Sequence, residues 1–365
     1  MPPLRMRREE RTAKYINKLR SFGKQNRTSQ YFTNWKNKQR LKKDSPFGII
    51  YKNNICKDEV TDTYLTNPII PHVGLPKVYF HLNLKQTVNK NEHPEYLKQL
   101  ALETINMIPK NAKKIFTDGS KDEFGHTGSG VLIMENEINK TLKLRNPDHS
   151  SVFRSELIAI DSALKSIARD TDTKYIWILT DSRSSIQHLQ NYQDVHDATG
   201  IHILQQLREL SQKIDIHFQW IPSHVGIQGN EIADSLAKEG SKGITPETEQ
   251  LTYTEIYSKF KMKTNQKWKL PPQHSWYKAK NPGDSIRTTL QRKEQTAIAR
   301  LKTGHLKTLK IIDGKKTFPI CPKCDTKEAS PQHILQCINS STTDLWNKPT
   351  DVIKLVQNNN LMDMV

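Results

Sequence analysis

The chain has 365 residues, of which 35% are hydrophobic, a formal net charge of +18 and a mean hydropathy of −0.72. No apolar run approaches the roughly 20 residues that a membrane span requires, and the charged first ten residues lack the apolar core of a secretory signal. We therefore expect no membrane partner and a reducing intracellular compartment, nucleus or cytoplasm, in which the four cysteines are thiols or metal ligands.

The positive charge is concentrated at the two ends of the chain. Residues 1–50 hold 14 Lys and Arg against 3 acids, and residues 242–365 hold 21 against 11. Residues 113–241 hold 14 against 18, so the middle is mildly acidic. Basic flanks favour a polyanionic partner, because each neutralised phosphate releases counterions. A solvated tail is the plainer interpretation of such charge.

In chain order, residues 1–60 form a basic extension with the runs K-L-R-S-F-G-K-Q-N-R-T and N-W-K-N-K-Q-R-L-K-K. Residues 61–112 contain prolines at intervals and are predicted to be a linker that leads to a short helix near Glu95–Ile108. No internal repeat is present.

Residues 113–241 alternate between strand and helix patterns. Five β-prone runs are bounded by turn residues: Lys113–Thr117, Gly128–Met134, Thr141–Leu144, Tyr175–Leu179 and Ile214–Ile221. Four segments have helical periodicity: Phe153–Ala168, about Ser182–Tyr192, about Gly200–Lys213 and Gly229–Glu239. Their order predicts an α/β domain with a mixed five-stranded sheet flanked by helices.

Four acidic residues occupy positions that suggest a common site. Asp118 and Asp181 each follow an apolar run and precede a small residue, which places both at strand ends, where α/β proteins gather their binding sites. Glu156 borders the apolar stripe of its helix, where a charge is costly unless it is compensated. Asp234 is expected in the first turn of the last helix.

Carboxylates that converge on one point repel each other unless divalent cations neutralise them. Hard oxygen ligands suit Mg²⁺ or Mn²⁺, and two such ions about 4 Å apart can clamp a phosphodiester during in-line attack by water. Taken singly, the acids also suit ordinary roles. Asp118 and Asp181 would close turns, and Asp234 would be favoured by the dipole at a helix start.

Four short motifs occur in order on these elements: T-D-G-S at 117–120, S-E-L at 155–157, T-D-S at 180–182 and H-V-G-I-Q-G-N-E-I-A-D at 224–234. With them the sequence resembles the type 1 ribonuclease H family, in particular the RNase H domains of non-LTR retrotransposon polyproteins. The resemblance covers Lys113–Ser241 and implies an RNase H-like fold.

The resemblance also implies roles for five residues. Asp118, Glu156, Asp181 and Asp234 would hold two divalent cations, and His224 would assist proton transfer or product release from a mobile loop. The substrate would be the RNA strand of an RNA–DNA hybrid, cut by metal-activated water to leave a 3′-hydroxyl and a 5′-phosphate.

The chain departs from the family pattern in one respect. Many cellular relatives carry a basic, Trp-containing protrusion that grips the hybrid, whereas Asn191–Leu210 contains Arg208 as its only fixed cation. Our hypothesis is that residues 1–50 and 242–365 supply the phosphate contacts instead.

A second candidate metal site follows the domain. Cys321, Cys324, His333 and Cys337 form the pattern C-x₂-C-x₈-H-x₃-C, which fits a tetrahedral zinc ion. Unligated thiols in a loop are the alternative. Similar Cys/His clusters follow the RNase H domain in related retroelement polyproteins.

The remaining segments are predicted to be a basic helical segment at 242–310, the Cys/His segment at 311–340 and a tail at 341–365. Residues 1–60 resemble the end of a retroelement reverse-transcriptase region, yet the chain has no aromatic-x-Asp-Asp polymerase motif. Two other functions stay open, an inactive transposon-derived nucleic-acid-binding protein and a DDE-type integrase. Integrases lack an acid on the first helix, so Glu156 argues against the second. The sequence does not indicate an oligomeric state.

Overall fold

The computed structural model describes ten stretches of the chain: residues 2–23, 26–33, 45–52, 58–66, 68–88, 92–135, 138–168, 174–244, 250–270 and 289–365. The chain divides into two compact units. One comprises Leu4–Met262, and the other comprises Lys263–Val365 with Met1–Pro3.

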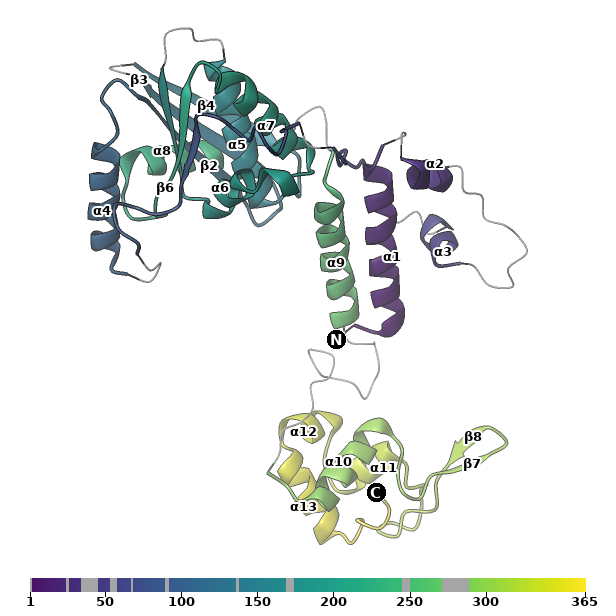
Figure 1. Ribbon diagram of the computed structural model, residues 1–365. Coiled ribbons are helices and arrows are strands. Elements are labelled where there is room, and N and C mark those ends of the chain that lie inside the picture. The colour runs from purple at the N-terminus through teal and green to yellow at the C-terminus, as the bar shows by residue number, and fades with distance from the viewer. Residues whose placement is uncertain are drawn as a thin grey trace. The chain divides into compact units, whose positions relative to one another are not determined.

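A six-stranded sheet forms the centre of the larger unit (Figure 1). Its strands are β1 (Val78–His81), β2 (Lys113–Lys121), β3 (Thr127–Glu135), β4 (Ile138–Asn146), β5 (Tyr175–Thr180) and β6 (Asp215–Trp220). They lie in the order β1-β6-β5-β2-β3-β4. The pairs β1–β6, β6–β5 and β5–β2 are parallel, whereas β2–β3 and β3–β4 are antiparallel. The sheet is therefore mixed, as the order of elements predicts.

The sheet has one strand more than the five expected. β1 lies in the segment predicted to be a linker, forms one edge of the sheet and pairs in parallel with β6. Its side chains stack on that neighbour: Phe80 lies 5.3 Å from Phe218 and Tyr79 lies 4.6 Å from His217, measured between ring centroids. Such cross-strand pairs stabilise a strand. A four-residue strand is too short to show a periodicity of its own, which is why the sequence did not reveal it.

Helices cover both faces of the sheet. They are α4 (Pro94–Asn106), α5 (Val152–Ile167), α6 (Arg183–Gln190), α7 (Ala198–Leu210) and α8 (Gln228–Gly240), with a 3₁₀ turn at Tyr192–Asp194. Figure 1 shows α5 and α7 on one face and α8 on the other. Two consecutive residues of β3 contact helices on opposite faces of the sheet. The hydroxyl of Ser129 donates to the carbonyl of Ser155 on α5, at 2.5 Å. A Cβ at Gly130 would lie 2.1 Å from the carbonyl oxygen of Ala233 on α8.

The predicted apolar faces form the core of this unit. Leu157, Ile160, Leu164 and Ile167 of α5 are all at most 1% exposed. Residues of β5 are equally buried, since Ile176, Ile178 and Leu179 have no exposed surface. The continuous apolar run of β5 therefore reflects a strand that is covered on both faces.

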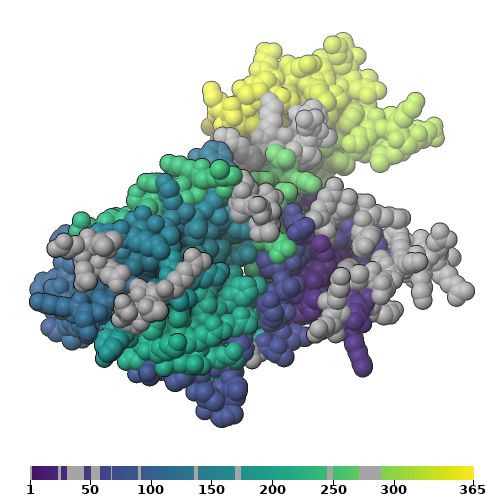
Figure 2. All heavy atoms as spheres, turned by 90° about the horizontal axis from the view of Figure 1, so that it is seen from above, coloured from purple at the N-terminus to yellow at the C-terminus, as the bar shows by residue number. Residues whose placement is uncertain are grey.

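Three helices precede the sheet and one follows it: α1 (Leu4–Ser21), α2 (Arg27–Thr33), α3 (Pro46–Lys52) and α9 (Tyr253–Lys269). A small apolar cluster, namely Ala13, Ile16, Phe47, Ile50 and Phe260, joins α1, α3 and α9. In the space-filling view, indigo atoms of the segment after α3 lie between the purple atoms of α1 and the teal domain (Figure 2). The second basic run of the N-terminal extension, residues 34–43, lies outside the described residues.

The smaller unit contains α10 (Arg292–Thr303), β7 (Lys310–Ile312), β8 (Lys315–Thr317), α11 (Pro331–Cys337), α12 (Thr342–Asn347) and α13 (Pro349–Asn358). The segment predicted to be a tail contributes to its core, since Val352, Ile353 and Val356 are at most 1% exposed. Among the described residues, no helix has the length and apolarity needed to cross a lipid bilayer.

Candidate active site

Asp118 and Asp181 occupy equivalent positions on two neighbouring strands. The parallel ladder between β2 and β5 ends at the pair Thr117 and Thr180, and each aspartate is the next residue. Asp181 follows the end of β5, as predicted. Asp118 does not lie at a strand end, because β2 continues to Lys121 as the antiparallel partner of β3. The two carboxylates therefore lie beside each other at the point where β5 ends and β2 continues.

Glu156 reaches the same point from the second turn of α5. Gly119 allows this approach, since a Cβ on it would lie 2.5 Å from the backbone nitrogen of Glu156. Only 4% of Glu156 is exposed, and its Oε2 atom has no hydrogen-bond partner among the described residues. A buried carboxylate oxygen without a partner is costly, so this atom fits a site that a cation completes.

One carboxylate oxygen each of Asp118, Glu156 and Asp181 lies within 4.8 Å of the other two. Burial, reinforced by the charges of Asp181 and Asp234, raises the pKa of Asp118 to about 7. Burial and the two neighbouring aspartates raise the pKa of Glu156 well above its usual value. Burial also raises the pKa of Asp181, and a hydrogen bond from Asn230 opposes that increase. Oxygen ligands in this arrangement can hold a hard divalent cation.

Asp234 is near this cluster without being part of it. Its Oδ2 atom accepts a hydrogen bond from Nζ of Lys238 at 2.6 Å, one turn further along α8. Its charge nevertheless raises the pKa of Asp118 and of Asp181. Because α8 begins at Gln228, Asp234 is the seventh helical residue, and the expected place in the first turn is wrong. The dipole at the start of α8 therefore does not account for an acidic residue at position 234.

His224 lies on the loop between β6 and α8. Its side chain is exposed, and its backbone has a φ of 54°, in the left-handed region that few residues other than glycine adopt. The charge of His224 lowers the pKa of Asp181, so the imidazole lies close to the acidic cluster. Lys98 of α4 borders this loop, because a Cβ at Gly226 would lie 3.2 Å from its Nζ atom.

Two further residues hold Asp181 in place. Nδ2 of the buried Asn230 donates to Oδ2 of Asp181 at 3.3 Å. Nε1 of Trp220 donates to the backbone carbonyl of Asp181 at 3.2 Å. Asn230 belongs to the sequence motif that contains His224 and Asp234. Nothing in the sequence indicates that Asn230 or Trp220 contacts Asp181.

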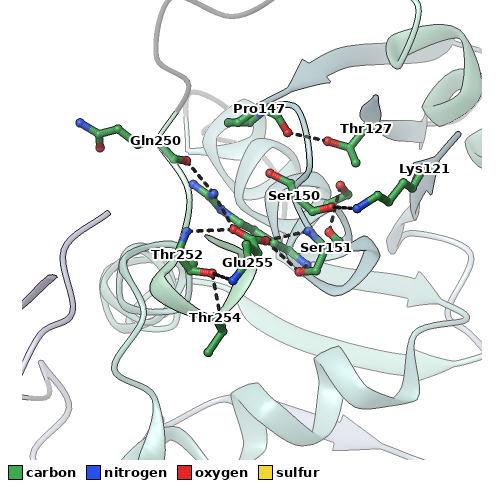
Figure 3. A network of polar contacts seen from close by, with 11 residues as sticks. Lys121, Thr127, Pro147, Ser150, Ser151, Gln250, Thr252, Thr254 and Glu255 are labelled. Atoms are coloured by element: carbon green, nitrogen blue, oxygen red, sulfur yellow. Dashed lines mark hydrogen bonds and ion pairs between the residues drawn. The ribbon is translucent and has the colours of Figure 1, made fainter. Parts of the chain in front are cut away.

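A carboxylate from beyond the predicted domain lies at the start of α5 (Figure 3). Glu255 of α9 is 5% exposed, and its Oε1 atom accepts from the backbone N–H and the hydroxyl of Ser151, at 2.7 and 2.9 Å. Its Oε2 atom accepts from the guanidinium of Arg154 at 3.2 Å and from the N–H of Thr252 at 2.9 Å. Glu255 was not among the predicted site residues. The only local signal is T-x-x-E at 252–255, which is typical of a capping box at the start of α9.

The Cys/His cluster of the smaller unit is also assembled. One ligand atom each of Cys321, Cys324, His333 and Cys337 lies within 4.8 Å of the others. The Sγ atom of Cys324 is 3.2 Å from Nε2 of His333, and the Sγ atoms of Cys321 and Cys337 are 4.0 Å apart. The second distance is close to the roughly 3.8 Å edge expected for two thiolates on one tetrahedral zinc ion.

The sequence of residues 110–242 matches the family model described as RNase H. The chain is 32% identical over 153 residues to a ribonuclease H of Dichelobacter nodosus, and the alignment covers 39% of this chain and 99% of that protein. It is 32% identical over 139 residues to a ribonuclease H of Nitrobacter hamburgensis, covering 34% of this chain and 89% of the relative. The fold, the acidic cluster and these matches define a hydrolase of the ribonuclease H class.

The chain belongs to the ribonuclease H family. A viral relative, the Pol polyprotein of equine infectious anemia virus, is 30% identical over 138 residues, which are 36% of this chain and 10% of the polyprotein. A crystal structure of a type 1 RNase H with the type 2 active-site motif shares 18% identity with a TM-score of 0.32, covering 38% of this chain and 76% of that one.

Proposed function

We propose that this protein hydrolyses the RNA strand of RNA–DNA hybrids with the help of two divalent cations, Mg²⁺ or Mn²⁺. The observation that carries the proposal is the convergence of Asp118, Glu156 and Asp181 within 4.8 Å, with one oxygen of Glu156 left without a partner. Three neighbouring carboxylates, two buried and one half-buried, whose pKa values are all raised are poorly stabilised by the protein alone. A bound divalent cation would offset that repulsion.

The four acids have different parts in this proposal. Asp118, Glu156 and Asp181 form the pre-assembled side of the site. Asp234 would join it only after its carboxylate leaves Lys238. Bound divalent cations lower the pKa of water and neutralise charge that develops on a phosphate. The chain would hold three of the oxygen donors at fixed places, and Asn230 and Trp220 orient Asp181 for that purpose.

His224 is proposed to transfer a proton or to assist product release. The imidazole is exposed on a loop, so it can approach a bound phosphodiester from solvent. Histidine is the side chain that most often transfers protons in catalysis. The 2′-hydroxyl is the group by which a site of this kind distinguishes RNA from DNA.

The test is a cleavage assay of the full chain with Mg²⁺ on three substrates: an RNA–DNA hybrid, an RNA duplex and a DNA duplex. We expect cleavage of the RNA strand of the hybrid alone, leaving a 3′-hydroxyl. Asp181→Asn should abolish it, while Asp194→Asn, at an exposed turn of the same unit, should retain it. Cleavage of all three duplexes would contradict the proposal.

The same assay separates the other two functions. Hybrid binding without cleavage would identify an inactive nucleic-acid-binding protein, and DNA strand transfer would identify an integrase. The first is disfavoured because all four acids and His224 are present, and the second because Glu156 lies on α5.

We further propose a structural zinc ion at Cys321, Cys324, His333 and Cys337, and an origin in a non-LTR retrotransposon polyprotein. The support for zinc is the clustering of three sulfur atoms and one imidazole. The support for the origin is a Cys/His cluster following an RNase H domain that resembles a viral Pol polyprotein. Zinc at one equivalent per chain in the purified protein, measured by mass spectrometry, tests the first. A reverse-transcriptase reading frame upstream of the gene or of its genomic copies tests the second.

A further inference from the structure

We propose that α1, together with residues 253–262 of α9, holds the phosphate backbone of the hybrid next to the acidic cluster. We call this pair of segments the cationic arm. The proposal rests on the proposed function, because it names the surface that would hold the same substrate.

The first observation is a stripe of four cations along α1. Arg7, Arg11, Lys14 and Lys18 follow the spacing i, i+4, i+7, i+11, which places them on one face of the helix. Arg7, Arg11 and Lys18 are exposed, and no ion pair joins any of the three to another described residue. The stripe is about 16 Å long. Because a single strand of duplex carries one phosphate per about 3.4 Å of axis, the stripe spans several phosphates.

The second observation is that the stripe adjoins α9. Nζ of Lys14 lies 4.7 Å from the centroid of the Tyr257 ring. Tyr257 and Lys261 are four residues apart on α9, so the exposed Lys261 lies on the same face of α9 as the contact with α1. Phe260 packs against the apolar residues Ala13 and Ile16 of α1. The two segments therefore pack against each other, and the cationic face of α1 borders the face of α9 that carries Lys261.

The third observation is that the arm is fixed to the domain at two places. The segment after α3 bonds to α1, to α9 and to the domain. Thr63 pairs with Ser21 of α1 and with Asp197 of the domain, and Asp58 accepts a hydrogen bond from Nζ of Lys259 on α9 at 3.2 Å. At the other place, Glu255 caps the N-terminus of α5 (Figure 3).

The cap brings the arm close to the candidate active site. Ser151, which Glu255 contacts, precedes Glu156 by five residues on the same helix. Five residues correspond to about 8 Å along a helix axis. A duplex that places a phosphodiester at Glu156 is therefore within reach of the arm.

The fourth observation is the negative net charge of the domain itself. Residues 113–241 hold more acids than bases. Arg208, the one fixed cation at 191–210, donates to the carbonyl of Pro68 at 3.0 Å. Lys238 is paired with Asp234. A polyanion at such a domain needs cations from elsewhere in the chain, and the arm supplies them.

The test compares two variants of the full chain with the same loss of charge. The first carries Arg7→Gln, Arg11→Gln and Lys18→Gln. The control carries Lys310→Gln, Lys315→Gln and Lys316→Gln, on the exposed hairpin of β7 and β8. Binding of a fluorescent RNA–DNA hybrid is measured in an Asp181→Asn background as a function of salt, and cleavage kinetics are measured with Asp181 intact.

We expect the arm variant to bind the hybrid about tenfold or more weakly at 0.1 M salt. The slope of log Kd against log salt should fall by about 2 to 3, because each lost phosphate contact contributes about 0.9. KM should rise in parallel while kcat at saturating hybrid stays within twofold of wild type. A variant with Arg7→Lys and Arg11→Lys should bind like wild type.

Equal weakening by the arm variant and the hairpin control would overturn the proposal, because net charge alone would then explain the effect. An unchanged salt slope in the arm variant would overturn it as well. Binding is measured separately from cleavage, so these outcomes are independent of the proposed function. That function fails if the wild-type chain leaves the hybrid uncut, whatever the arm variant does.

Discussion

Glu255 accepts hydrogen bonds from both the backbone N–H and the hydroxyl of Ser151, which lies 104 residues earlier in the chain. In a capping box, the side chain of a glutamate three positions after the N-cap residue accepts a hydrogen bond from the backbone N–H of the N-cap residue. In α5 the residue three positions after the N-cap is Arg154, so Glu255 of α9 accepts the hydrogen bond from the N–H of Ser151 instead. Glu255 also forms reciprocal hydrogen bonds with Thr252 at the start of its own helix. The helix that carries Glu156 therefore depends on a residue beyond the part of the chain that matches the family.

Replacing Glu255 should destabilise the larger unit strongly. Glu255→Ala leaves Arg154 buried without its partner, since the two side chains are 5% and 13% exposed. Breaking a buried ion pair in this way costs about 3–5 kcal/mol. Urea denaturation measures the change. Glu239→Ala is the matched control, because Glu239 and Lys143 form an exposed pair, which contributes about 0–1 kcal/mol. Equal destabilisation by the two substitutions would show that the cap has no special role.

Asp118→Asn should stabilise the metal-free protein in a pH-dependent way. The pKa of Asp118 is raised from 3.8 to about 7 in the folded chain, so the folded state binds more protons than the unfolded state between these values. Stability contributed by the protonated group is present below about pH 4 and is lost as pH rises to about 7. Asparagine does not ionise. The variant should therefore melt about 10 °C above wild type at pH values above 7 and at almost the same temperature as wild type at pH 4.

Thermal melts in EDTA at pH 4, 6 and 8 measure this difference. Comparing the two proteins at each pH cancels the contributions of groups outside the acidic cluster, such as His81 and His217, whose pKa values burial lowers. With Mg²⁺ present, the order should reverse, because only wild type gains from the cation. Asp363→Asn, at an exposed carboxylate, should show no trend with pH. A constant difference between Asp118→Asn and wild type would be inconsistent with a raised pKa.

Lys238→Gln should make Asp234 available to a cation. Nζ of Lys238 lies 2.6 Å from the carboxylate and competes with any metal ion there. We expect the Mg²⁺ concentration for half-maximal cleavage to fall severalfold. Lys165→Gln is the control, since Lys165 pairs with Asp161 at the same spacing and the same 2.6 Å distance on α5. If the metal requirement rises instead, Lys238 supports the site rather than competing with it.

His224→Ala should lower kcat by about 100-fold at pH 7, as is typical when a group that transfers protons is lost. KM and the Mg²⁺ requirement should change little, because His224 is not one of the residues proposed to hold the cations. His202→Ala removes another exposed histidine of the same unit and should have no effect. A larger change in KM than in kcat would assign His224 to substrate binding.

Removing zinc should unfold the smaller unit alone. Cys324→Ser, or treatment with a strong chelator, deprives the cluster of a ligand or of its ion, and bound zinc contributes directly to folding. We expect an earlier melting transition for Lys263–Val365 and an unchanged transition for Leu4–Met262. Cys321 is a poorer site for this test because it is completely buried in the core of the unit. No bound zinc and no change in melting would contradict a zinc site.

Much of the larger unit was predictable because its signals are local. Five strands and the helices after them follow from apolar runs and helical periodicity, and the stripe Leu157, Ile160, Leu164 and Ile167 is buried as predicted. The convergence of Asp118, Glu156 and Asp181 followed from their places on these elements. The Cys/His cluster was equally readable, since its four ligands occur within 17 residues.

The sequence alone thus determined which side chains carry charge and which local element each one occupies, because the periods of helices and strands are set by neighbouring residues. Only the tertiary structure decided which of these groups meet. It separated Asp234 from the other acids by pairing it with Lys238, added β1 to the sheet and placed Glu255 at the start of α5. The last two arrangements join residues more than 100 positions apart, whose contacts leave no periodic signal in the chain.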